Sequence, residues 1–183
     1  MSKRIGVLIG SLREGSYNRA IAEAVASLLP EDYEVVEVEI ENLPFYNEDL
    51  DHEGKTPQEW TEFREKVSTL DAFILATPEY NRSTAPALKN ALDVGSRPYG
   101  QSVWTQKPAL ITTASMGGIG GFGANHHLRQ SLVFLDMPVV QQPEVYIGAA
   151  HNVVDENGKI TDQETLGFLQ TAADTFVELI NRY

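Results

Sequence analysis

The chain contains no cysteine, and this absence removes several classes of chemistry. Disulfide bonds, thiol redox centres and cysteine-held zinc or iron–sulfur clusters are all excluded. The beginning of the chain has an apolar run that meets Arg13 and Glu14 early, so it indicates a first core strand better than a secretion signal. We therefore expect a cytoplasmic protein.

Positive charge and long hydrophobic runs are also scarce. Lysine and arginine number 14 against 26 aspartate and glutamate residues, and the net charge is −12. Such a field repels phosphate backbones and anionic bilayers, so we expect no nucleic-acid partner. No segment approaches the roughly 18 apolar residues that a membrane span needs. Without repeats, low-complexity stretches or linkers, the sequence predicts one domain over residues 1–183.

Strand and helix patterns alternate along the chain. Two helices begin at capping-box patterns, Thr56 with Glu59 and Thr161 with Glu164. Strands are predicted over residues 3–10, 34–40, 72–76, 107–113 and 138–145, and helices over 18–29, 56–69, 85–94, 124–135 and 161–181. The alternation predicts an α/β fold with a parallel sheet between helical layers. Right-handed crossovers favour the strand order 2-1-3-4-5, with the half-polar segment 34–40 at an edge.

In that order, the loops after the first, third and fourth strands meet at the switch point of the sheet, where such folds bind ligands. The first loop, residues 10–18, supplies serines, an arginine and an asparagine directly before a helix. Unpaired N–H groups at a helix start, with these side chains, form a phosphate cradle. The loop lacks the Gly-Lys-Ser/Thr of a P-loop. A plain helix cap is the alternative interpretation, but it needs only one Ser or Asn.

The other two loops predict walls for a planar ligand. Residues 77–83 place an aromatic ring, a carboxylate and an amide after Pro78, which stiffens the backbone. Residues 115–123 contain five glycines, which let the backbone approach a flat ring closely. Gly118, Gly120 and Gly123 also match a G-x-G-x-x-G dinucleotide pattern with Glu144 about twenty residues further on, but a single glycine pattern is a weak indicator.

Two other polar features do not predict chemistry. His126 and His127 are helix neighbours that point in different directions, so we interpret them as core or subunit contacts and predict no metal site. The acidic loop that contains Asp49 and Asp51 is interpreted as solvated surface. Since no Ser-His-Asp set or carboxylate pair stands out, the three loops are typical of a site where a cofactor performs the reaction.

Several segments resemble, in order, the flavodoxin-like NAD(P)H-dependent FMN reductases, and within them the quinone and chromate reductase branch. They are GSLREGSYN (10–18), LPFYNEDL (43–50), PEYNRSTAPALKNALD (78–93) and the loop 115–121. The resemblance spans nearly the whole chain. It implies a flavodoxin-like three-layer sandwich, non-covalently bound FMN and a homodimer or homotetramer. It also implies that NADPH or NADH reduces FMN and that two electrons then pass to quinones, azo dyes, chromate, or ferric or free flavin.

By position, the resemblance assigns site residues in three groups. The FMN phosphate would be held by Ser11, Arg13, Ser16, Tyr17 and Asn18. The flavin ring would be edged by Pro78, Glu79, Tyr80 and Asn81, and on its other side by Ser115, Gly117, Gly118 and Gly120. Arg97, just past the third helix, and Tyr80 are the expected substrate contacts, and Arg97 would hold an anionic group. Departures from the family pattern at Val94, Gly123 and His126 lie toward expected subunit contacts.

The sequence thus predicts an FMN-dependent NAD(P)H:acceptor oxidoreductase with a ping-pong mechanism and no catalytic side chain. One alternative is a flavodoxin-type electron carrier without its own substrate, although such carriers use a Ser/Thr-rich phosphate loop where this chain has arginine and asparagine. A flavin-binding regulator is a second alternative. The sequence shows no group that would select NADH over NADPH.

Overall fold

The structure, a computed structural model, describes residues 2–183. Its single sheet has five parallel strands: β1 (Arg4–Ile9), β2 (Glu34–Glu37), β3 (Ala72–Thr77), β4 (Ala109–Ala114) and β5 (Val145–Ile147). Their order is β2-β1-β3-β4-β5, which confirms the predicted flavodoxin-like topology. Ile9 pairs with Ala76 and Thr77 with Thr113, so the three central strands end side by side.

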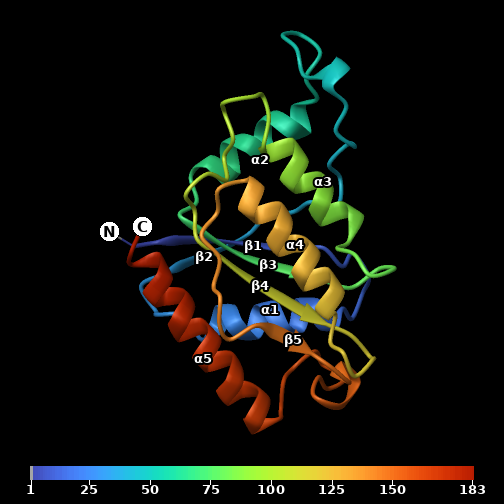
Figure 1. Cartoon of the computed structure of the whole chain (residues 1–183), viewed down its shortest axis with the longest axis vertical. Helices are drawn as coiled ribbons and strands as arrows, with labels where there is room; N and C mark the ends of the chain where they lie inside the picture. Colours follow the sequence, from blue (N-terminus) through green and yellow to red (C-terminus); the bar gives the residue numbers. More distant parts are fainter. Residues whose placement is uncertain (1) are drawn as a thin grey trace.

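Helices cover both faces of this sheet (Figure 1). On one face lie α1 (Tyr17–Ser27) and α5 (Gln163–Ile180), and on the other α2 (Gln58–Ser68), α3 (Pro86–Gly95) and α4 (Phe122–Phe134), with two 3-10 turns at Glu48–Leu50 and Ala150–Asn152. One core packs around Ile21 and Phe176, and the other around Phe73, Trp60 and Trp104. None of the helices that residues 2–183 form has the length and apolar character to cross a bilayer.

The two edge strands differ in how well the sequence predicts them. β2 lies at an edge and is mostly exposed, as its alternating pattern indicates. For the other edge, the predicted strand over residues 138–145 is wrong. Val139 makes one isolated bridge to Ala109, and the chain rejoins the sheet only at Val145. Pro138 and Pro143 lack the N–H groups that a continuous ladder requires.

The two capping-box predictions also need correction. Helix α2 has Pro57 as its N-cap, and the Thr56 hydroxyl instead donates to the carbonyl oxygen of His52 at 3.2 Å. Helix α5 is capped one residue later than predicted, because the Asp162 carboxylate accepts the N–H of Thr165 at 2.7 Å. At α5, the carboxylate of Asp162 is a stronger acceptor than the hydroxyl of the neighbouring Thr161 and takes the capping position.

The segment between β2 and α2 (residues 38–57) projects beyond the helices at the top of Figure 1. It is nevertheless fixed to α2 and α3. Trp60 Nε1 donates to the Pro44 carbonyl oxygen at 2.9 Å, and Asn90 Oδ1 accepts the N–H of Tyr46 at 2.9 Å. Asp51, predicted to be solvated, is only 5% exposed and receives two hydrogen bonds from Arg64. Part of this acidic loop is therefore anchored.

Candidate functional site

The loops after β1, β3 and β4 leave the same edge of the sheet, at its right side in Figure 1. Gly10 marks how closely they approach one another. Its N–H donates to the Ala76 carbonyl oxygen at 2.7 Å, and a Cβ at this position would lie 3.1 Å from Leu88 Cβ and 3.2 Å from Ala85 Cβ. A side chain here would push the first loop away from the start of α3. The predicted convergence is therefore present.

Asn18 joins the first loop to the end of β4. Its Nδ2 donates to the Ala114 carbonyl oxygen at 3.0 Å, and its Oδ1 accepts the Ala114 N–H at 2.8 Å. This pair of hydrogen bonds holds the buried amide between the first loop and β4. The contact of Asn18 with the FMN phosphate stays a prediction, for which its backbone N–H is unpaired.

The loop from residue 10 to 18 keeps its donors unpaired. Within the described chain, no residue accepts a hydrogen bond from the backbone N–H groups of Ser11 through Asn18. Ser16 is the N-cap of α1 and accepts the Arg19 N–H at 3.3 Å. Arg13 is exposed, with its guanidinium 5.2 Å from the ring centre of Tyr17. Free amides, a helix start and an arginine together provide the donor set that a phosphate group needs.

After β3, the chain forms a two-residue hairpin that the sequence analysis missed. Tyr80 and Ser83 exchange backbone hydrogen bonds at 2.9 and 3.0 Å. The two residues between them, Asn81 and Arg82, have φ angles of 51° and 69°. Positive φ at both positions defines a type I′ turn, and Asn at its first position is the signal that could have predicted it. The turn holds the half-exposed Tyr80 ring at the rim of the edge.

Beneath this hairpin, Thr77 fixes the start of α3. Its Oγ1 accepts the N–H of Ala85 at 2.9 Å and lies 3.0 Å from the Thr84 hydroxyl. The Glu79 carboxylate is also engaged, since it accepts the N–H of Ala124 at 3.2 Å. The Pro78–Asn81 wall is therefore held from two sides.

The glycine loop after β4 is anchored on one side and open on the other. The Ser115 N–H donates to the carbonyl oxygen of Ile147 at 3.0 Å, and the Ala149 N–H donates to the carbonyl oxygen of Gly117 at 3.2 Å. A Cβ at Gly118 would meet nothing within 4 Å. No described residue accepts the backbone N–H groups of residues 116–119. This loop presents bare backbone donors to the same edge as the hairpin.

The histidines and Glu144 are used outside the three loops. His126 and His127 are exposed, so the core role expected as one alternative is wrong, and the other alternative, a subunit contact, stays a prediction. Glu144 lies 3.6 Å from His126 and 3.5 Å from the Arg129 guanidinium, which is partly buried. Burial lowers the pKa of Arg129, and the Glu144 carboxylate opposes this shift. The Glu144 carboxylate therefore pairs with side chains of α4. It does not support the dinucleotide pattern, in which this acid would bind a ribose.

Arg97 is not brought to the site by its own chain. It follows the C-terminal end of α3, whereas the hairpin precedes the N-terminal end of this ten-residue helix. A helix of this length separates its ends by about 15 Å. Arg97 and Tyr80 are therefore apart within one protomer, and the substrate contact of Arg97 stays a prediction. The other predicted site residues all lie in the three converging loops.

The donors at this edge fit FMN. A phosphate dianion suits the unpaired amides and Arg13 of the first loop, and the carbonyl oxygens and ring nitrogens of a flavin suit the free backbone N–H groups of the other two loops. The glycines leave room for a flat ring to lie against backbone. The residues that would hold FMN are thus Ser11 to Asn18, Pro78 to Asn81 and Ser115 to Gly120.

Comparison with known proteins supports FMN as the cofactor. A family described as NADPH-dependent FMN reductase matches residues 3–152. A quinone reductase of Pseudomonas putida is 51% identical over 176 residues, which are 96% of this chain and 94% of the relative. A 2-hydroxy-1,4-benzoquinone reductase of a Burkholderia species is 42% identical over 96% of this chain and 95% of its own.

A solved structure extends the comparison to the fold. FerB of Paracoccus denitrificans, a flavoenzyme NAD(P)H:(acceptor) oxidoreductase, superposes with a TM-score of 0.90 at 34% identity and covers 98% of each chain. The shared fold therefore extends over nearly the whole of both chains. This chain therefore belongs to the NADPH-dependent FMN reductase family, as an enzyme with FMN as its cofactor and NAD(P)H as its electron donor.

Proposed function

We propose that this enzyme is an NAD(P)H:quinone oxidoreductase that works by a ping-pong mechanism. The observation that carries the proposal is the edge where three loops present unpaired backbone N–H groups beside a half-exposed Tyr80 ring. Two relatives, at 51% and 42% identity, carry quinone reductase names, which supports quinones as the acceptor class.

Each loop has a defined task in this proposal. Ser11, Ser16, Arg13 and the amides through Asn18 hold the phosphate, while Pro78–Asn81 and Ser115–Gly120 edge the ring. When bound, FMN supplies the chemistry, by accepting a hydride from NAD(P)H and passing two electrons to the acceptor. The hairpin and the glycine loop orient the ring and leave one face open. NAD(P)H and the acceptor use that face in turn, and Tyr80 lies where a planar group would stack.

The same open face accounts for a wider set of acceptors. Stacking against a flat ring needs few fixed polar groups, so azo dyes, chromate, and ferric or free flavin would compete with quinones at one place. We expect quinones to be favoured because they are planar and match the exposed aromatic rim.

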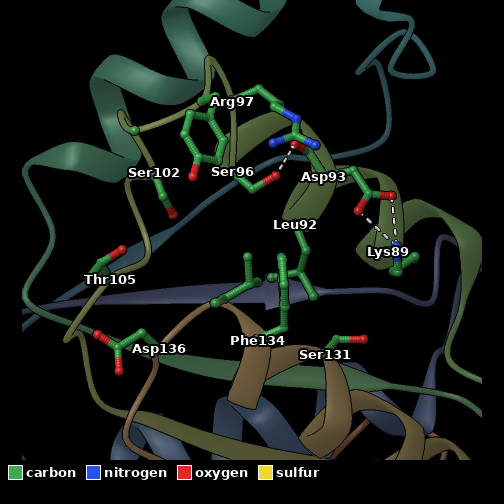
Figure 2. Close-up of a pocket in the computed structure, with 13 residues that line it drawn as sticks. Lys89, Leu92, Asp93, Ser96, Arg97, Ser102, Thr105, Ser131, Phe134 and Asp136 are labelled. Carbon is green, nitrogen blue, oxygen red and sulfur yellow. Dashed lines mark hydrogen bonds and ion pairs between the residues drawn. The ribbon is translucent and has the colours of Figure 1, made fainter.

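We also propose that a second copy of the chain packs against the α3–α4 face. Between these helices lies a cavity of about 450 Å³, with Leu92 facing into it and Phe134 beside it (Figure 2). Phe134 is 89% exposed, Val133 76% and Tyr99 91%. A two-fold contact is self-complementary, so the apolar ridge of one copy can fill the hollow of the other. This gives a homodimer, and pairing of dimers through other exposed apolar side chains gives a homotetramer.

Steady-state kinetics tests the proposed reaction. Purified protein should be yellow, and it should oxidise NADH or NADPH when benzoquinone is added. Varying both substrates should give parallel lines in double-reciprocal plots, as a ping-pong mechanism requires. Colourless protein without turnover contradicts the proposal. FMN-loaded protein that exchanges electrons with a partner protein but does not oxidise NAD(P)H favours the flavodoxin-type carrier.

A further inference from the structure

Helix α4 begins without a cap from its own segment. Its N-cap position is Gly121, in the left-handed conformation at φ 84°, and no side chain at that position accepts a hydrogen bond. The first N–H groups of a helix need partners from elsewhere. One partner is supplied by a residue 45 positions earlier in the chain: the Glu79 carboxylate Oε2 accepts the N–H of Ala124 at 3.2 Å.

The other oxygen of the Glu79 carboxylate contacts a residue of the hairpin. Glu79 Oε1 accepts a hydrogen bond from the Arg82 guanidinium at 3.2 Å. The Glu79 side chain is 14% exposed, whereas that of Arg82 is 74% exposed. An exposed ion pair contributes little, so the contact with Ala124 is the stronger of the two. Glu79 thus connects the hairpin after β3 to the helix that follows the glycine loop.

Gly123 makes this connection possible. A Cβ at this position would lie 3.0 Å from Glu79 Oε2 and 3.2 Å from the Arg82 carbonyl oxygen. The carbonyl oxygen belongs to the backbone of the hairpin and cannot rotate away, so a side chain here would force the hairpin and α4 apart. A second contact lies one turn further along α4, where His127 Nδ1 is 3.1 Å from the Ser83 hydroxyl oxygen.

We propose that Glu79 is a positioning residue for FMN: its carboxylate oxygen caps α4 and thereby sets the spacing between the two loops that edge the flavin ring. The inference rests on the proposed placement of the ring between these loops. It assigns Glu79 no proton transfer and no direct part in the reaction. The acceptor oxygen on Ala124 N–H, rather than the negative charge, performs this task.

Two substitutions separate the effect of the Glu79 acceptor oxygen from the effect of its negative charge. Glu79→Gln keeps an oxygen that can accept from Ala124, and it should bind FMN within about threefold of the unmodified protein, because a neutral acceptor still caps the helix. Glu79→Ala removes the acceptor and should raise the Kd for FMN about tenfold, since a lost cap loosens the first turn of α4. Quenching of FMN fluorescence measures both values on the apoprotein.

Gly123→Ala perturbs the same contact from the other side, with Glu79 intact. It should also raise the Kd for FMN, and the double variant with Glu79→Ala should bind more tightly than the product of the two single effects predicts, because both changes break one interaction. Glu178→Ala is the matched control, since its carboxylate also pairs with an arginine, Arg182, at 3.7 Å, but on α5. This control should leave FMN affinity unchanged.

Hydrogen exchange of the apoprotein reads the cap without any flavin. The Ala124 amide should exchange faster in Glu79→Ala than in Glu79→Gln or Glu178→Ala. If the Ala124 amide exchanges at an unchanged rate in Glu79→Ala, Glu79 does not cap α4. If it exchanges faster but FMN affinity stays at the wild-type value, the cap does not position the flavin ring. If the unmodified protein itself fails to bind FMN, the placement of the ring is what fails, and the exchange result still decides whether Glu79 caps α4.

Discussion

Thr112 carries a buried hydroxyl group that no partner satisfies. It lies on β4, is fully buried, and its Oγ1 has no hydrogen-bond partner within the described chain. Thr112→Val removes the polar atom and keeps a β-branched shape that suits the strand. We expect the free energy of unfolding to rise by about 1 kcal/mol, measured by urea denaturation. Thr113→Val serves as the control, because the Thr113 hydroxyl donates to Val145 at 3.3 Å; an equal or greater gain there would contradict the explanation.

Unlike Thr112, Asn18 makes hydrogen bonds with both the nitrogen and the oxygen of its side-chain amide. Asn18→Ala leaves the N–H and carbonyl oxygen of Ala114 unpaired in a buried place. We expect a loss of about 2 kcal/mol in the free energy of unfolding, since buried unpaired groups are costly. FMN affinity should fall as well, because the phosphate loop and the glycine loop lose their shared anchor. Thermal unfolding and FMN titration check both effects.

The matched control for Asn18 is Asn181→Ala, which changes an exposed asparagine just after α5, near the C-terminus that lies on the opposite side of Figure 1 from the three loops. It should leave the midpoint of thermal unfolding unchanged. If Asn18→Ala binds FMN as the unmodified protein does, the amide is only a fold contact, and its link to the site is wrong.

At the scale of elements, a buried ion pair helps to anchor the long segment between β2 and α2. Asp51 and Arg64 have side chains 5% and 13% exposed, and Arg64 also donates to the Val94 carbonyl oxygen at 2.9 Å. Asp51→Ala leaves the Arg64 charge buried without its partner. The expected cost is about 3 kcal/mol in the free energy of unfolding, since removal of one member of a buried pair is strongly destabilising.

The loss of this pair should also appear locally. Limited proteolysis should cut the segment 43–57 faster in Asp51→Ala, because the hydrogen bonds of the segment to α2 are then fewer. Glu53→Ala, an exposed acid in the same loop, should change neither stability nor cleavage. Equal cleavage of the two variants would show that Asp51 is surface, as the sequence alone predicts.

At the scale of the whole molecule, the parts of the fold that follow from local chemistry were predictable from the sequence. Strand and helix order, the edge position of β2 and the meeting of three loops follow from hydrophobic periodicity and right-handed crossovers. Long-range pairs were not predictable. The contacts of Asp51 with Arg64, Asn18 with Ala114 and Glu79 with Ala124 join residues that are far apart in sequence, and a single sequence does not show which polar groups meet.

The position of Arg97 shows the same distinction. Arg97 follows a helix that begins at the site, but the ten residues of this helix separate its two ends by about 15 Å. The type I′ hairpin at Asn81 and Arg82 was missed for the reverse reason. The residues are adjacent and Asn81 suits the first position of the turn, but Arg82 is uncommon at positive φ, so the pair is a weaker signal than Asn-Gly.

The proposed assembly gives a prediction for the molecule as a whole. Phe134→Glu places a charge on the most exposed aromatic side chain of α4, at the rim of the 450 Å³ cavity. Phe134 has little packing within its own chain, so the variant should keep its circular dichroism spectrum and still fold. Light scattering after size-exclusion chromatography should show a monomer, whereas the unmodified protein should show twice or four times the chain mass.

Charge adds a second, independent part to this prediction. Each chain has a net charge of −12, so two copies repel one another at long range. At 0.1 M salt the screening length is about 10 Å, and added salt should therefore strengthen association of the unmodified protein. Tyr183→Glu, which also charges an exposed aromatic residue but at the chain end, should keep the assembled mass. A monomeric unmodified protein, or a Phe134→Glu variant with the assembled mass, would place the subunit contact elsewhere, because the α3–α4 face could not then be what holds the copies together.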